Sequence, residues 1–214
     1  MKNPVLFVTG IDTNIGKTYA TAFLARKFME TGEKVITQKM IQTGCSGNSE
    51  DIEKHRELLG QPFLQEDEER LTAPIIYSYP CSPHMAARID GKKTDLSVIE
   101  RATQKLIERG YDRVILEGAG GLMVPLTEDC LTVDYIQQKD YPVALVTNGR
   151  LGSINHTVLS LEVCRNRNIE VEYVIYNKYP ACDRLICEDT VKYLTGYLSK
   201  YHPNAILLIM DELV

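Results

Sequence analysis

The stretch Gly10-Ile11-Asp12-Thr13-Asn14-Ile15-Gly16-Lys17-Thr18 lies directly between an apolar run, residues 5–8, and a segment with helical spacing, residues 19–30. Gly16 removes a side chain where backbone must approach phosphate, and Lys17 supplies a cation for the β and γ oxygens. The hydroxyl of Thr18 is placed to ligate magnesium. A chance Gly-Lys-Thr at a helix start is the alternative, but strand, loop and helix are in register here. The stretch therefore predicts a phosphate-binding loop, in a variant form because five residues separate Gly10 from Gly16 where four are usual.

Apolar runs and helical segments alternate along the rest of the chain. The runs are rich in Val, Ile and Leu on both faces, which is typical of buried parallel strands. In the segment 19–30, apolar residues recur at a helical spacing that lays one face on a sheet. We expect strands at residues 5–8, 35–37, 114–116, 143–146, 171–175 and 205–209, and helices at 19–30, 51–59, 96–108, 155–166 and 184–201.

This alternation predicts an α/β fold: a single domain, residues 1–214, with a mostly parallel central sheet covered by helices on both faces, similar to P-loop NTPases. The length of 214 residues suits one core, and 44% hydrophobic with 25% charged residues is ordinary for a globular protein. Ligands of such sheets bind at the edge formed by the carboxyl ends of the strands. The acidic stretch of residues 65–70 is expected to be a solvated loop or helix face.

Charge and hydropathy exclude several classes of partner. The net charge is −5 and no dense basic run is present, so we expect no nucleic-acid binding. No apolar stretch is long enough to span a membrane and no signal-peptide pattern is seen, so we expect a cytoplasmic protein. No C-x-x-C spacing occurs, and the cysteines are expected to be small hydrophobes in a reducing compartment: Cys45, Cys81, Cys130, Cys164, Cys182 and Cys187.

Two carboxylates are candidates for a metal shell. Glu117 follows the strand 114–116 and is expected at the same sheet edge as the loop, with glycines behind it that permit close backbone approach to a ligand. A helix cap or a loop ion pair is the alternative for this residue. Asp51, at the start of a predicted helix, could complete the shell or act as a plain N-cap. Glu50 and Glu53 compete with it for the metal.

Taken together, these motifs resemble the dethiobiotin synthetase family. The resemblance covers residues 4 to about 178 in consistent order, and the segment Leu151-Gly152-Ser153-Ile154-Asn155-His156 makes it specific. The other matching motifs are the loop ending Gly16-Lys17-Thr18, Lys39 with Thr43-Gly44, Asp51, Ser82-Pro83-His84, Glu117-Gly118-Ala119-Gly120-Gly121, and Asn177.

The resemblance implies an ATP- and magnesium-dependent homodimer that closes a cyclic urea on 7,8-diaminononanoate with carbon dioxide, supplied as bicarbonate. It implies catalytic roles for Lys39 and Lys17, and magnesium ligation by Thr18, Asp51 and Glu117. The implied nucleotide-binding residues are Asn14, Ile15, Gly16, Lys17, Thr18, Tyr19, Asp51, Glu117, Gly118, Ala119, Gly120 and Asn177, the last reading adenine. The implied substrate-binding residues are Thr13, Lys39, Thr43, Ser82, Gly152, Ser153 and Asn155.

The family holds the distant carboxylate of its substrate across the dimer interface, near residues 152–156. Ser153 looks like a helix N-cap, and a helix N-terminus attracts an anion. The chain departs from the family after its last strand, residues 205–209, where a Gly-x-Ile-Pro stretch is common. We therefore expect weaker discrimination between bases, with GTP or CTP partly replacing ATP. Arg150 stands where the family often has lysine.

Three other functions compete with this one. A long-loop ATPase that controls dimerisation or partner binding would share the phosphate loop, but leaves the joint presence of Lys39, Thr43 and residues 151–156 unexplained. A carboxylate-activating amidoligase would need an ammonia source, for which this chain has no room. A pure binding module would leave the lysines and metal ligands without a role.

Overall fold

The computed structural model describes residues 3–181 and 183–211. Its centre is a six-stranded sheet in the order β10-β9-β8-β1-β5-β2, and every neighbouring pair of strands runs parallel. The predicted α/β class and all six predicted strands are confirmed. The strands are β1 (Val5–Gly10), β2 (Val35–Lys39), β5 (Arg113–Gly121), β8 (Val143–Asn148), β9 (Val171–Asn177) and β10 (Ile206–Met210).

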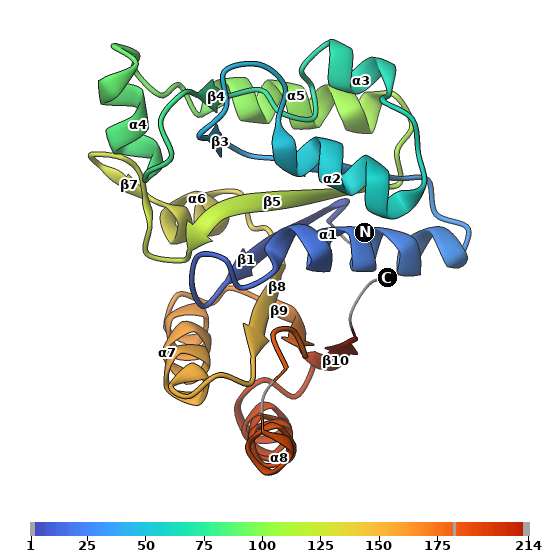
Figure 1. Cartoon of the computed structure of the whole chain (residues 1–214), viewed down its shortest axis with the longest axis vertical. Helices are drawn as coiled ribbons and strands as arrows, with labels where there is room; N and C mark the ends of the chain where they lie inside the picture. Colours follow the sequence, from blue (N-terminus) through green and yellow to red (C-terminus); the bar gives the residue numbers. More distant parts are fainter. Residues whose placement is uncertain (1–2, 182, 212–214) are drawn as a thin grey trace.

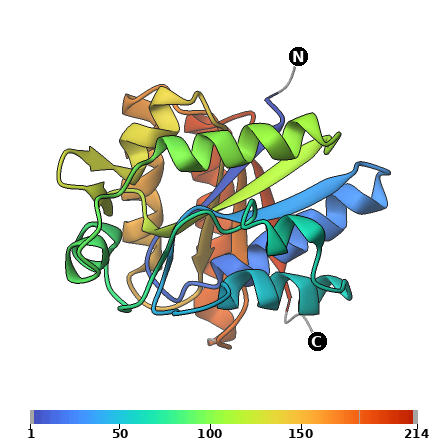
Figure 2. The same cartoon turned by 90° about the horizontal axis from the view of Figure 1, so that it is seen from above.

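Helices cover both faces of this sheet (Figure 1). Figure 2 shows α5 (Ser97–Glu108) and α1 (Lys17–Glu30) on opposite sides of the strands. Alternate residues of β1 explain the two layers, because Val5 and Phe7 join the core beneath α5 while Leu6 and Val8 join the core beneath α1. The face with α5 also carries α6 (Thr132–Gln138), α7 (Ser153–Asn166) and α8 (Arg184–Tyr201).

Smaller elements lie on the β2 side of the sheet (Figure 1). Helix α2 (Glu50–Leu59) packs against α1 and is followed by the short α3 (Gln65–Glu68). Two small sheets, and the helix α4 (Pro83–Ile89), complete this side. The small sheets pair β3 (Gln42–Thr43) with β4 (Ile76–Tyr77) and β6 (Pro125–Thr127) with β7 (Cys130–Leu131).

The structure corrects two expectations from the sequence, for Ser153 and for residues 65–70, and excludes one alternative, for Asp51. Ser153 is not an N-cap: Gly152, at a φ of 90°, caps α7, and the buried Ser153 hydroxyl donates to Asn148 Oδ1 at 2.8 Å. Asp51 is not an N-cap either, because Ser49 accepts from the Ile52 amide at the start of α2. The stretch 65–70 is not wholly solvated, because Asp67 is buried and forms an ion pair with Arg56 of α2.

The cysteines follow the expectation only in part. Cys45 and Cys164 are buried free thiols, while Cys81 and Cys130 are free and half-buried. Cys187 is disulfide-bonded, which corrects the expectation of reduced cysteines throughout, and Cys182 lies outside the described residues. Among the described helices, none is both long and apolar enough to cross a membrane.

Candidate active site

The phosphate loop runs from the end of β1 into the first turn of α1. Asn14 and Gly16 have positive φ values of 56° and 95°, so the chain makes a left-handed turn just before the helix begins at Lys17. Ile15 between them is buried beneath the loop and anchors it in the core. The free amides of the first helical turn therefore face the cavity that Gly16, Lys17 and Thr18 line.

Asn177, at the end of β9, holds this loop in shape. Its side-chain nitrogen donates to the Ile15 carbonyl at 3.0 Å, and its oxygen accepts from the Tyr179 amide at 3.0 Å. A Cβ at position 16 would lie 2.4 Å from the same nitrogen. Glycine at position 16 is thus required both by the backbone turn and by the contact with Asn177.

Lys17 reaches back across the loop. Its ammonium donates to the Asp12 carbonyl at 3.1 Å, and the side chain is buried. Burial lowers the pKa of Lys17 to about 8, and the nearby charge of Lys39 acts in the same direction. The Asp12 carboxylate is paired with Arg150 from the loop after β8, and this hydrogen bond lowers the pKa of Asp12.

Lys39 ends β2 between two carboxylates. Its Nζ lies 2.7 Å from Asp51 Oδ2 and 2.7 Å from Glu117 Oε1, and it donates to the Gly118 carbonyl at 3.3 Å. Burial opposes the charge of Lys39, but the two carboxylates outweigh it and raise the pKa of this lysine. Burial likewise opposes ionisation of Glu117, yet Lys39 and His55 bring the pKa of this carboxyl far below its usual value. Lys39 and the two carboxylates therefore form a charge cluster in which Lys39 and Glu117 are buried and Asp51 is partly exposed.

The Thr18 hydroxyl lies next to both carboxylates of this cluster, so that three oxygens suited to metal ligation are close together. Thr18 Oγ1 lies 2.8 Å from Asp51 Oδ1 and 3.3 Å from Glu117 Oε1. Among the three acids in the first turn of α2, the described contacts join Asp51 to Thr18. The described residues contain no group of three or more His, Cys, Asp or Glu suited to a metal. Two carboxylates and one hydroxyl nevertheless match the donor set of a magnesium ion that shares its other positions with phosphate and water.

His55 joins this cluster and was not anticipated from the sequence. It lies on α2, four residues after Asp51, and its Nε2 is 2.8 Å from Glu117 Oε2. The spacing of four residues places both side chains on one helix face. That spacing is the only signal in the sequence, and it does not identify Glu117 as the partner.

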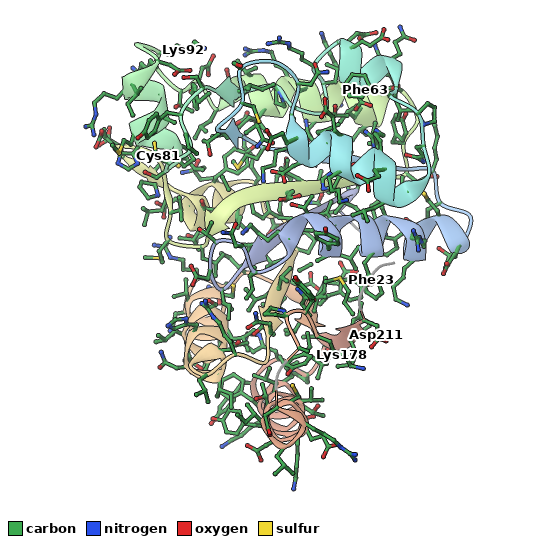
Figure 3. All side chains as sticks on the ribbon, in the orientation of Figure 1. Phe23, Phe63, Cys81, Lys92, Lys178 and Asp211 are labelled. Atoms are coloured by element: carbon green, nitrogen blue, oxygen red, sulfur yellow. The ribbon has the colours of Figure 1, made fainter. Side chains whose placement is uncertain are left out.

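A cavity of about 940 Å³ opens at this edge of the sheet. In Figure 3, Cys81, two residues before α4, lies above α1, and the side chains of Lys178 and Asp211, which form an ion pair, lie below α1. Cys81 and Asp211 both line the cavity. The sequence analysis assigned no binding or catalytic role to ten of its lining residues: Ile41, Gln42, Pro80, Cys81, Pro83, Val124, Tyr179, Pro180, Met210 and Asp211. The predicted residues that line it are Thr13, Asn14, Gly16, Lys17, Thr18, Tyr19, Lys39, Thr43, Asp51, Ser82, Glu117, Ala119, Gly120 and Asn177.

Five predicted residues lie outside this lining. Ile15 is buried under the loop. Gly118 contributes its carbonyl to Lys39, and a Cβ there would lie 2.8 Å from the Phe7 ring, so strand packing rather than ligand approach explains this glycine. Gly152, Ser153 and Asn155 are at the start of α7, near the loop through the Asp12–Arg150 pair but not in the cavity wall.

Comparison with solved structures places this fold. The signal recognition particle receptor FtsY from Elizabethkingia anophelis superimposes with a TM-score of 0.56 at 17% identity, covering 100% of this chain and 61% of that one. A putative plasmid partition protein from Borrelia burgdorferi B31, bound to AMPPNP, gives 0.56 at 14% identity, covering 99% and 88%. A family model described as an AAA domain matches residues 5–208. Fold and loop together define a P-loop NTPase.

Sequence relatives narrow this class. An "ATP-dependent dethiobiotin synthetase BioD 2" of Pasteurella multocida is 51% identical over 97% of this chain and 97% of its own length. An "ATP-dependent dethiobiotin synthetase BioD" of Chlorobaculum tepidum is 47% identical over 94% of this chain and 84% of its own length. The chain belongs to the ATP-dependent dethiobiotin synthetase family, whose members are ligases of biotin biosynthesis.

Proposed function

We propose that this protein closes the ureido ring of dethiobiotin from 7,8-diaminononanoate, carbon dioxide and ATP, with magnesium, in the cytoplasm. The observation that carries the proposal is the convergence of two lysines, two carboxylates and a threonine hydroxyl at one end of a single cavity. Residues 1–214 are proposed to act as one domain.

The proposed chemistry has three steps. One amine of the substrate adds carbon dioxide and loses a proton, which gives a carbamate. A carbamate oxygen attacks the γ-phosphorus, ADP leaves, and a carbamic-phosphoric anhydride forms. The second amine attacks the carbonyl carbon, inorganic phosphate leaves, and the ring closes with loss of a proton. Phosphoryl transfer of this kind needs positioning and charge neutralisation more than covalent help.

The residues of the site are proposed to divide these tasks. The loop amides and Lys17 bind the phosphates, and Lys39 neutralises charge between carbamate and γ-phosphate. Thr18, Asp51 and Glu117 would hold magnesium, which when bound supplies charge neutralisation at the phosphates. Thr13, Thr43 and Ser82 are proposed to contact the substrate, because they line the same cavity.

A second copy of the chain is proposed to complete the substrate site. Gly152, Ser153 and Asn155 lie outside the cavity, so their role at the substrate carboxylate requires a homodimer. Leu151 and Leu159, on the same stretch of surface, are 83% and 57% exposed, which favours burial against another protein surface. Sedimentation equilibrium should give twice the monomer mass, and a monomer at micromolar concentration would contradict the proposal.

The decisive experiment supplies ATP, magnesium, bicarbonate and 7,8-diaminononanoate and looks for the cyclic urea by mass spectrometry. Product should require every component and should be lost in Lys17→Ala. ATP hydrolysis that is equally fast without the diamine, with no cyclic urea, would instead favour a long-loop ATPase. A competition titration with GTP and CTP tests the proposed weak base discrimination, which a strong preference for ATP would refute.

A further inference from the structure

Among the histidines that the structure describes, His55 is fully buried, and it contacts the proposed metal ligand Glu117. Its exposed fraction is 0%, and it lies on α2 one turn after Asp51. Helix α2 therefore carries both Asp51 and the group that touches Glu117, which comes from the opposite side on β5. One rigid helix thereby fixes the relative placement of the two carboxylates.

The two oxygens of Glu117 have different partners. Oε2 accepts from His55 Nε2 at 2.8 Å. Oε1 lies 2.7 Å from Lys39 Nζ and 3.3 Å from Thr18 Oγ1. An ionised carboxylate only accepts hydrogen bonds, so the imidazole must present an N–H at Nε2. This contact restrains rotation of the carboxylate, and Oε1 stays directed at Lys39 and Thr18.

A purely structural role explains His55 less well. Its Nδ1 has no hydrogen-bond partner within the described part of the chain. A buried polar nitrogen without a partner destabilises a core, so an apolar side chain of similar size would suit packing better at this position. What a leucine could not provide is the hydrogen bond to Glu117.

We propose that His55 is a positioning residue that fixes the rotation of Glu117 so that Oε1 faces the magnesium of the nucleotide complex. The inference rests on the proposed function in one respect, the assignment of Glu117 to the metal shell. Groups that orient metal ligands typically change metal affinity or activity by about 10- to 100-fold when removed. His55 would act through Glu117, because His55 itself does not line the cavity.

Two variants separate the hydrogen bond from the volume of the side chain. His55→Leu keeps the bulk and removes the donor, whereas His55→Gln places an amide N–H near the position of Nε2. Binding of manganese ion to the protein with ADP is followed by electron paramagnetic resonance, a readout that needs no turnover. We expect affinity to fall about 10-fold or more in His55→Leu and to stay within about 3-fold in His55→Gln.

Ile52→Val is the matched control, because Ile52 is buried on the same helix and its side chain is wholly apolar. It should loosen packing and leave manganese affinity unchanged. A similar loss in Ile52→Val and His55→Leu, or wild-type affinity in His55→Leu, would overturn the positioning role. Should His55→Leu not fold, His55→Asn takes its place: its shorter amide does not reach Glu117, and affinity equal to that of His55→Gln would overturn the inference.

The outcome is separable from that of the proposed function. Wild-type protein that forms no cyclic urea, with His55→Leu still impaired in manganese binding, would refute the reaction and support the positioning of Glu117. Suppose instead that wild-type protein forms the product and that His55→Leu equals it in manganese affinity and in the magnesium dependence of kcat/KM. That result would support the reaction and refute the positioning role of His55.

Discussion

Helix α2 contributes residues to two charge clusters, of which one borders the cavity and the other is enclosed by protein. His55 belongs to the site cluster, and the next residue, Arg56, belongs to a second group that we call the scaffold cluster. The members of the site cluster are Lys39, Asp51, His55 and Glu117, and those of the scaffold cluster are Thr37, Arg56, Asp67 and Thr72.

The scaffold cluster is closed. Arg56 binds Asp67 through two nitrogens, at 2.9 and 2.8 Å, and donates to Thr37 at 3.0 Å. The remaining capacity of the Asp67 carboxylate is taken by Thr72 at 2.6 Å and by the Leu64 amide at 2.7 Å. Each charge is thus satisfied by protein, and the cluster ties α2 to α3 and β2.

The site cluster instead borders the cavity, where Lys39, Asp51 and Glu117 are all lining residues. Its lysine is shared between two carboxylates rather than paired with one. Charges that face a cavity can exchange protein partners for ligand. We therefore expect changes in the site cluster to alter chemistry and changes in the scaffold cluster to alter stability.

The largest effect is expected for Lys39→Ala. Because the charge of Lys39 matters most when the phosphate oxygens gain negative character, turnover should fall by about 100- to 1,000-fold while ADP affinity changes by less than about 3-fold. Phosphate release with diamine and bicarbonate measures the first quantity, and calorimetric titration measures the second. Lys27→Ala, exposed on α1, is the control. Turnover equal to wild type would remove Lys39 from the mechanism.

Asp67→Asn should break the scaffold cluster instead. It leaves the buried Arg56 without its carboxylate, and the free energy of unfolding should fall by about 3 kcal/mol. Urea denaturation measures this, and kcat of the folded protein should stay within about 2-fold of wild type. Thr72→Val removes one hydrogen bond only and should cost about 1 kcal/mol. An Asp67→Asn protein of normal stability with impaired turnover would contradict the distinction between the clusters.

Acid should remove the same stabilisation. Burial raises the pKa of Asp67, but its hydrogen bonds from Arg56 and Thr72 prevail and lower the pKa below the ordinary 3.8. The stability advantage of wild type over Asp67→Asn is therefore fully present above pH 3.8 and is lost as the pH falls through the folded-state pKa. Urea denaturation at pH 7, 5 and 3 should give equal advantages at the first two values and a smaller one at the third. A decline already between pH 7 and 5 would assign the effect to another group.

The smallest expected effect is the pH dependence of ADP binding that Lys17, a residue of the cavity wall, should cause. With a pKa of about 8, the ammonium that binds phosphate becomes about 10-fold scarcer in the free protein between pH 7 and pH 9, so ADP affinity should fall by about 10-fold. Lys17→Arg, which stays charged, should show a flat profile across this range. Calorimetric titration at pH 7, 8 and 9 tests this, and a flat wild-type profile would show that Lys17 keeps its proton.

The strands were predictable because burial on both faces leaves a plain apolar pattern, but their ends were not. The prediction stopped at residue 37, whereas β2 continues through Gln38 and Lys39. Both are buried, since Gln38 donates to the Leu71 carbonyl and Lys39 meets two carboxylates. Partners that lie far away in sequence made these polar residues compatible with a core strand.

The same reason limits prediction of the two clusters. The phosphate loop and Glu117 could be expected together, because a parallel sheet gathers its strand ends at one edge. Asp51 lies on a helix, and the sequence left it in competition with Glu50 and Glu53. The contact of His55 with Glu117 joins residues 62 apart, and no local pattern reports it. Asp67 lies in an acidic stretch whose composition is typical of a solvated surface. Its ion pair with Arg56, which the local sequence does not indicate, makes its burial possible.

Asn177 has a consequence for engineering. The strand that carries it, β9, is separated from β1 by β8, yet its amide supports the Ile15 carbonyl and fills the space that a side chain at Gly16 would need. The conformation of the turn before α1 is thus stabilised by a residue outside the loop, Asn177. A transplant of residues 10–18 into another protein would carry the loop sequence but not the hydrogen bond from Asn177. The recipient would need a side-chain amide two strands away to give the loop the same conformation.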